Sequence, residues 1–186
     1  MNQFLNAKRK NGFTLIELMV AVALFSAIAM VVVVIFVSGF RSQQRAMTFQ
    51  VLFDQTSFFT EYLARQVRMA RRSVGGTCIP IGDNYQTTHG SQGLRFITSE
   101  CGCEEIFLEA ATGRIKEDRD GVQNYLTSED LKVTDLSFAL SGESELDTLQ
   151  ARVTISLKIR GASNRPEGQP ALKIQTTISQ RKLDIQ

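Results

Sequence analysis

The most pronounced feature of the hydropathy pattern is a run from Leu18 to Val37 in which only Ser26 is polar. A helix needs roughly 20 apolar residues to cross the hydrocarbon core of a bilayer, whereas a secretory signal has an apolar region of roughly 7–15. The run has the longer length, and no small-residue cleavage site of the A-x-A type follows it. The pattern therefore predicts a single membrane-spanning helix over residues 13–40, in preference to a secretory signal or a buried core helix.

A helical pattern continues beyond the apolar run. Apolar residues recur at spacings of seven and four, at Phe40, Met47, Val51, Phe58 and Tyr62, and the stripe is widened by Leu52, Phe59 and Leu63. No proline occurs in residues 13–73, and Gly75-Gly76 provides a stop. We therefore predict that residues 41–74 form the amphipathic half of the same helix. Four arginines near its end fit a solvated face favoured by the helix dipole better than a DNA or lipid patch.

From residue 75 onward the pattern changes to short strands and turns. Strands are predicted around the Cys101–Cys103 turn, and Thr112-Gly113 indicates a hairpin. Strict alternation of apolar and polar residues predicts three further strands. The predicted strands are at 94–98 and 106–108, followed by those around 136–140, 153–159 and 172–178. We expect residues 75–186 to form an antiparallel β-sheet that covers the amphipathic half-helix, which makes the fold class α+β.

Composition and charge exclude several classes of function. Apolar residues make up 43% and charged residues 22% of the 186-residue chain, so neither whole-chain disorder nor a polytopic membrane protein fits. A formal net charge of +2 is too small for a protein that coats nucleic acid, and DNA binding is not indicated. One histidine and three cysteines leave little material for a catalytic or metal site. We expect no enzyme activity and no cofactor.

Residues 8–18 read KRKNGFTLIEL and closely resemble the N-terminus of type IV prepilins and type II secretion pseudopilins. In that family a basic leader ends in Gly and is followed by Phe-Thr-Leu-Ile-Glu and an apolar stretch. The resemblance implies that a membrane prepilin peptidase removes the leader, residues 1–12, by cutting between Gly12 and Phe13. It implies that Phe13 then becomes an N-methylated first residue, and that Glu17 is the family's acidic residue. It also implies a type IV pilin-like fold.

Glu17 conflicts with a purely apolar span, because a carboxylate at mid-bilayer costs about 2.5–3.5 kcal/mol. One interpretation is that it pairs with the new α-amine of Phe13 on an adjacent subunit, mainly as a register device. The other is that it reaches the membrane interface, since it lies only about 6 Å along the helix from Phe13. The residues alone leave both open.

Three further features of the sequence are candidate sites. We expect one structural disulfide among the three cysteines. Either Cys78 pairs with Cys101 or Cys103, or Cys101 and Cys103 pair with each other. The segment 117–121, EDRDG, has some acids of a calcium loop but an arginine in the middle, and a solvated turn is favoured. His89 lies in a polar stretch without catalytic context and is expected on a surface loop.

These observations favour a structural subunit of a type IV pilus, competence pilus or type II secretion pseudopilus. Residues 58–72 look like the second helical half of larger minor pilins and J-type minor pseudopilins, which favours a minor or initiating role. Its partners would be the prepilin peptidase, other pilin or pseudopilin subunits, the inner-membrane assembly platform, and lipid before assembly. The basic residues 8–10 favour a cytoplasmic N-terminus and an extracytoplasmic C-terminal domain, although Arg41 and Arg45 flank the other side. The alternative is a membrane-anchored binding module that does not polymerise.

Overall fold

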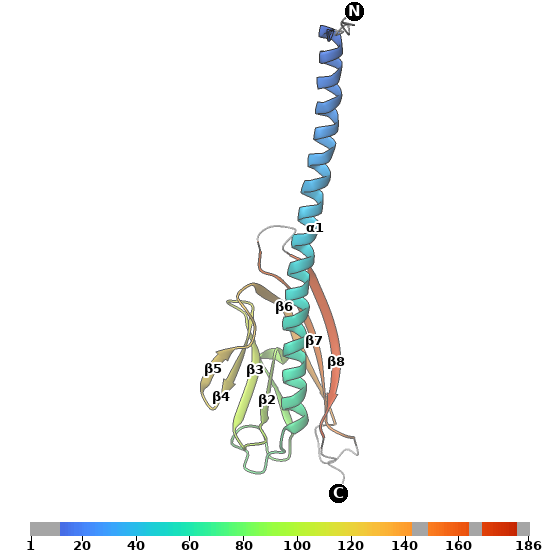
Figure 1. Cartoon of the computed structure of the whole chain (residues 1–186). Helices are drawn as coiled ribbons and strands as arrows, with labels where there is room; N and C mark the ends of the chain where they lie inside the picture. The colour runs from blue at the N-terminus through green and yellow to red at the C-terminus, as the bar shows by residue number, and fades with distance from the viewer. Residues whose placement is uncertain (1–11, 143–148, 164–168, 182–186) are drawn as a thin grey trace, which may run out of the picture. The chain divides into compact units, whose positions relative to one another are not determined.

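The computed structural model describes residues 12–142, 149–163 and 169–181 (Figure 1). These residues form an α+β fold with one long N-terminal helix, a short 3-10 turn (η1, His89–Ser91) and eight strands. The chain divides after Gln43 into two compact units, which are described separately below. Most of the predicted leader lies outside the described residues.

Helix α1 extends from Leu15 to Met69 and therefore belongs to both units. It ends five residues before the predicted bound at 74. The reason lies in the tertiary structure: the backbone N–H of Arg71 donates to the Ile97 carbonyl at 2.8 Å, and that of Ser73 donates to Asp83 at 2.9 Å. Once these N–H groups bond to the sheet and the following loop, they cannot continue the helix.

The C-terminal half of α1 buries only one side of the predicted apolar stripe. Phe40, Met47, Val51 and Phe58 stay exposed, and Tyr62 is only partly buried. The buried residues are those that widened the predicted stripe, together with two others: Leu52, Thr56, Phe59, Leu63 and Val67. The exposed and the buried apolar stripes lie about 100° apart around the helix, since Phe58 and Phe59 are consecutive residues, and periodicity alone does not say which stripe meets the sheets.

Five strands form an antiparallel meander in the order β1-β2-β3-β4-β5. They are β1 Tyr85–Thr88, β2 Gly93–Ile97, β3 Cys103–Glu109, β4 Arg114–Arg119 and β5 Val122–Tyr125. The strands predicted at 94–98 and 106–108 and the hairpin at Thr112-Gly113 are confirmed. Gly113 has a φ of +68°, a conformation that a glycine adopts without steric cost. Strands β1 and β5 were not predicted.

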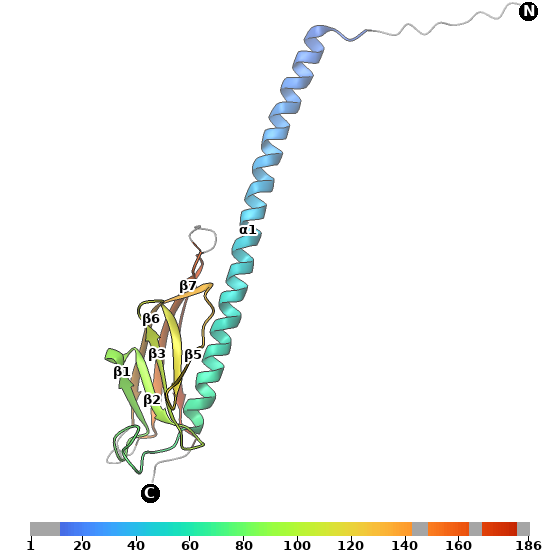
Figure 2. The ribbon, with the colours of Figure 1, turned by 90° about the vertical axis from the view of Figure 1, so that its left-hand side faces the viewer.

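The last three strands form a second sheet in the order β6-β7-β8, so the prediction of one sheet was wrong. They are β6 Leu131–Ser141, β7 Arg152–Gly161 and β8 Ala171–Ser179, at the three positions where alternation predicted strands. Both sheets share one core with the C-terminal half of α1, and Figure 2 shows the backbone of this part from the side. Two sheets can enclose one helix face where a single strongly twisted sheet would have to curl.

Candidate processing and assembly site

The predicted processing junction lies just before α1. Gly12, Phe13 and Thr14 precede the first helical residue, and all three are exposed. Thr14 acts as the N-cap: its Oγ1 accepts a hydrogen bond from the Glu17 backbone N–H at 3.4 Å, and its carbonyl accepts one from Leu18 at 3.2 Å. Threonine followed three residues later by glutamate is the sequence of a capping box. This local signal marks the start of the helix at Leu15, which hydropathy alone does not locate.

Gly12 has no structural reason within this chain to be glycine. A Cβ placed on it would have no neighbouring heavy atom within 4 Å. Its φ is also not among the positive values, unlike that of Gly113. The fold therefore accommodates a side chain at this position. Any requirement for glycine here must come from a molecule that acts on the junction.

Glu17 lies in the first turn of α1, where a negative charge interacts favourably with the helix dipole. Its bond to Thr14 uses the backbone N–H and not the carboxylate. The side chain is exposed, as is that of Phe13. The structure thus places an exposed carboxylate about one helical turn from the predicted new N-terminus. The roles of Gly12, Phe13 and Glu17 stay predictions.

The first half of α1 presents a continuous apolar surface. One 18-residue window of this helix has a mean hydropathy of 3.1 and none of it is buried inside the structure, so the helix is long and apolar enough to cross a membrane. The hydroxyl of Ser26 donates to the Val22 carbonyl at 2.8 Å, which satisfies the polar group of the run within the helix. An exposed surface of this kind is stable in lipid or against other apolar helices.

The comparison with known protein families matches residues 7–39 to the prokaryotic N-terminal methylation motif. This is the prepilin-type cleavage and methylation motif of type IV pilins and pseudopilins, so the chain carries the N-terminal signature of that class. The motif implies processing by a prepilin peptidase and assembly with other pilins. Neither the comparison with curated proteins nor that with solved structures gives a significant match.

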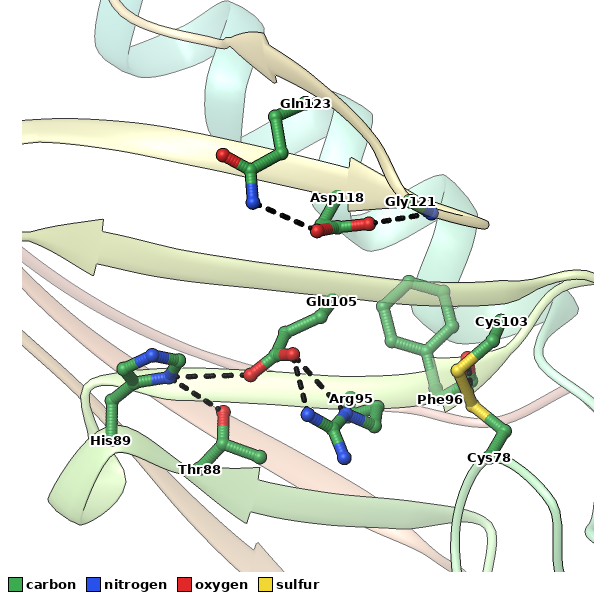
Figure 3. Close-up of polar contacts among 10 residues, drawn as sticks. All are labelled: Cys78, Thr88, His89, Arg95, Phe96, Cys103, Glu105, Asp118, Gly121 and Gln123. Carbon is green, nitrogen blue, oxygen red and sulfur yellow. Dashed lines mark hydrogen bonds and ion pairs between the residues drawn. A yellow bond between two sulfur atoms is a disulfide. The ribbon is translucent and has the colours of Figure 1, made fainter.

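The cysteines form one of the pairings that the sequence left open. Cys78 and Cys103 form a disulfide with a Cα–Cα distance of 5.6 Å, which joins the loop after α1 to the start of β3 (Figure 3). Cys101 is exposed and carries a free thiol. Its Sγ accepts a hydrogen bond from the Arg71 guanidinium at 3.1 Å. A period-two alternation could not have separated Cys101 from Cys103, because the two residues are two positions apart and have the same parity.

The acids of the segment 117–121 point to different protein groups. Asp118 accepts hydrogen bonds from the Gly121 N–H and the Gln123 amide, both at 2.9 Å (Figure 3). Asp120 accepts one from the Cys103 N–H at 2.8 Å, while Glu117 faces α1. The segment closes the turn between β4 and β5, and these bonds use the oxygens that a calcium loop would direct at the ion.

A carboxyl cluster, formed by Glu104, Glu117, Arg119 and Tyr62, lies between the five-stranded sheet and α1. Arg119 donates to Glu104 at 2.7 Å and to Glu117 at 3.2 Å, and the Tyr62 hydroxyl donates to Glu117. Glu104 is fully buried. Burial, reinforced by neighbouring Glu117, raises the pKa of Glu104 to about 7, so it is largely protonated in mildly acidic solution.

Sequence reasoning missed the carboxyl cluster. The signal was present, because Glu104 alternates with Ile106 and Leu108 on β3, and Glu117 follows Ile115 on β4. In a period-two pattern those positions point toward the core. An acid at a core position predicts a buried charge with a partner, here Arg119.

His89 lies in the turn between β1 and β2, as expected, but it is not isolated. Its ring stacks on Phe107 with centroids 4.6 Å apart, and its Nδ1 lies 3.2 Å from a Glu105 carboxylate oxygen. The same carboxylate accepts a bond from Arg95 at 2.7 Å (Figure 3). Among the described residues, no group of three or more His, Cys, Asp or Glu side chains is arranged to hold a metal ion.

Proposed function

We propose that this chain is a non-enzymatic, pilin-like structural subunit. Prepilin peptidase cuts it between Gly12 and Phe13, and the processed chain enters a filament through the first half of α1. The observation that carries the proposal is the coincidence of the methylation motif at residues 7–39 with an exposed apolar helix that begins at Leu15. A mere membrane anchor needs the apolar helix but not the motif.

In this proposal the first half of α1 lies first in the membrane and later among the helices of other subunits. Before processing it spans the membrane with its basic leader in the cytoplasm and residues 44–186 outside. Cleavage removes Lys8, Arg9 and Lys10, which otherwise hold the helix end at the membrane surface. The apolar side chains then pack against the helices of other subunits, which offer the same kind of contact as lipid.

Within this class we propose a minor or initiating role in a type IV pilus, a competence pilus or a type II secretion pseudopilus. The support is the loose resemblance of residues 58–72 to minor subunits, together with a C-terminal region that contains two sheets. The disulfide between Cys78 and Cys103 fits an extracytoplasmic location, because disulfides persist in oxidising compartments.

The decisive experiment is intact-mass spectrometry of the full chain coexpressed with a prepilin peptidase, with a catalytically inactive peptidase as control. We expect a product that begins at N-methylated Phe13 with the active enzyme only. Immunodetection in sheared, purified filaments then tests assembly. An uncut chain would contradict the proposal. A cut chain that never enters filaments would instead support the anchored binding module.

A further inference from the structure

The outer edge of β8 is open in the part of the chain that the structure describes. β8 lies at the end of the three-stranded sheet and pairs only with β7 (Figure 1). Its nine residues keep one continuous register with β7, whereas β6 is interrupted between Val133 and Asp135. An edge strand of this length without a bulge or proline presents backbone N–H and C=O groups that a further strand can bind.

A groove of 420 Å³ separates this edge from the C-terminal half of α1. Phe53 and Ala64 line it from the helix, and Leu172 and Ile174 line it from β8. The Phe53 side chain is largely exposed, and Leu172 and Ile174 are only half-buried. The groove therefore offers apolar surface to side chains that would point from an added strand toward the helix.

A basic hollow of 690 Å³ at the end of α1 adjoins the groove, with which it shares Glu61, Ala64 and Arg68 as lining residues. Arg65, Arg68 and Arg181 line this hollow, and Glu61 is the one acid among its described lining residues. Glu61 lies 3.5 Å from Arg65 and balances its charge. The positive charges of Arg68 and Arg181 are therefore not balanced by an acid among the described lining residues. A carboxylate is a group that such a pair of guanidinium ions binds through charge-assisted hydrogen bonds.

We propose that β8 accepts an extended, acidic-ended segment of a partner protein as a fourth strand. The backbone of that segment bonds to the β8 edge, its alternate apolar side chains enter the groove, and its acidic end meets Arg68 and Arg181. The groove extends from Phe53 to Arg68, about 22 Å of helix, which a strand of about seven residues covers. Backbone bonds would supply affinity, and the side chains in the groove would supply specificity.

The acidic end should be the N-terminal end of the added segment. Both sheets of the protein are antiparallel throughout, and antiparallel pairing is the slightly more stable arrangement. β8 runs toward the basic hollow, since Ser179, Gln180 and Arg181 line that hollow. A strand antiparallel to β8 therefore begins there. This inference concerns residues 44–186 and does not depend on processing or on filament assembly.

The probe is a fluorescein-labelled peptide, Asp-Asp-Val-Thr-Val-Thr-Val with blocked ends, titrated with the purified full chain in detergent micelles. Fluorescence anisotropy should show saturable binding that protein-free micelles do not give. Arg68→Glu should weaken binding at least tenfold, whereas Arg45→Glu, on the same helix but outside the groove, should leave it unchanged. Amides of residues 171–179 should gain protection from hydrogen exchange when the probe binds.

Two N-methylated probes separate strand addition from apolar adsorption. One carries N-methyl groups on both threonines and the other on the first two valines. In antiparallel pairing only alternate residues bond to the neighbouring strand. One of these probes should therefore lose binding while the other keeps it. Equal binding of both, or no saturable binding of the parent probe, would overturn the proposal. Binding seen only after removal of residues 182–186 would also overturn it, because the groove would then belong to the chain's own end.

Discussion

Glu17 takes part in the first turn of α1 through its backbone, whereas its carboxylate remains exposed. The Thr14 hydroxyl accepts a hydrogen bond from the Glu17 N–H, a contact that any residue at position 17 can make. Substitution of Glu17 therefore alters charge without removing the cap. A substitution at position 17 therefore tests the role of the carboxylate alone.

We expect Glu17→Leu to insert into the membrane at least as well as the wild-type chain, because it removes a liability of about 2.5–3.5 kcal/mol from the span. Cleavage before Phe13 should continue. The amount in sheared filaments, relative to the major subunit, should fall, because a neighbour's α-ammonium would lose its partner, typically at a cost of about 3–5 kcal/mol.

Glu17→Gln, which keeps the shape but not the charge, is the control for this experiment. It separates loss of the ion pair from loss of a hydrogen bond. Normal recovery of Glu17→Leu in filaments would make the interfacial position of Glu17 the better account.

Gly12→Val should abolish processing. Because a Cβ at position 12 meets nothing in this chain, the substitution leaves the fold intact, and lost cleavage would report on the peptidase cleft. The measurement is the intact mass after coexpression with the peptidase. Gly39→Val is a matched control, since a Cβ there is equally unobstructed. A normal product that begins at Phe13 in Gly12→Val would refute this role for the glycine.

The carboxyl cluster predicts a pH dependence of stability. The pKa of Glu104 rises from 4.5 to about 7 on folding, so the folded state binds this proton more tightly than the unfolded state. The contribution of Glu104 to the free energy of unfolding is fully present below about pH 4.5. It decreases as the pH rises toward 7 and does not change further above that pH. Thermal unfolding of the full chain in micelles, followed by circular dichroism, should show this decline.

Glu104→Gln should flatten the decline between pH 4.5 and 7, because a neutral amide has no proton to lose. Glu100→Gln, at an exposed turn, should retain the wild-type profile. The hydrogen bond from Lys116 lowers the pKa of Glu109 to about 2. Glu109 therefore affects stability only below about pH 4.5, where its contribution is lost as the pH falls. An unchanged profile in Glu104→Gln would show that the cluster does not set the pH response.

At the scale of elements, the end of α1 is determined by its contacts with the sheets. The Tyr85 hydroxyl donates to the Val67 carbonyl at 2.7 Å, and the Gln180 amide donates to the Ala70 carbonyl at 2.9 Å. The Arg181 N–H donates to the Arg68 carbonyl at 3.1 Å. These groups satisfy carbonyls that a glycine cap would otherwise serve. Residues from β1 and from the segment that follows β8 thus replace the Gly75-Gly76 stop.

The disulfide connects two elements, the loop after α1 and strand β3. It closes a loop over a sequence separation of 25, so its removal in Cys78→Ser should lower the free energy of unfolding by about 3 kcal/mol. Thermal unfolding of the oxidised full chain measures this. Cys101→Ser should leave stability nearly unchanged. A comparable loss in Cys101→Ser would mean that Cys101 and not Cys103 forms the bond.

At the scale of the whole molecule, the two units have different requirements of their surroundings. The buried core draws only on residues from Leu52 onward, and it combines α1 with both sheets. The unit up to Gln43 has almost no buried side chains among its described residues. It needs a membrane or other helices to cover its apolar surface, whereas residues 44–186 cover their own.

A chain that begins at Gln44 should therefore fold without a membrane. We expect a soluble monomer that unfolds cooperatively and contains the Cys78–Cys103 bond, because truncation removes none of the core residues. Size-exclusion chromatography, thermal unfolding and disulfide mapping test this. Aggregation is the opposite result, and it would show that the exposed side chains of Met47, Phe49 and Phe53 need the first half of the helix or a partner to cover them.

Features that depend on neighbours along the chain were predictable from the sequence. The motif around Gly12 and Glu17 is contiguous, the apolar run has a length set by the bilayer, and β7 alternates strictly from Val153 to Ile159. Each of these patterns lies within one short stretch of the chain, so it can be recognised without knowing which distant residues it contacts. The hairpin at Gly113 belongs to this group as well.

Features that depend on residues far apart in the sequence were settled only by the tertiary structure. α1 carries two apolar stripes, and the positions of the sheets determined that Leu63 is buried while Phe58 is exposed. Division into two sheets, the partner of Cys78 and the end of the helix at Met69 likewise depend on long-range contacts. A local period specifies which residues share a face, but the free energy of burial depends on what that face meets, and only the folded chain supplies that surface.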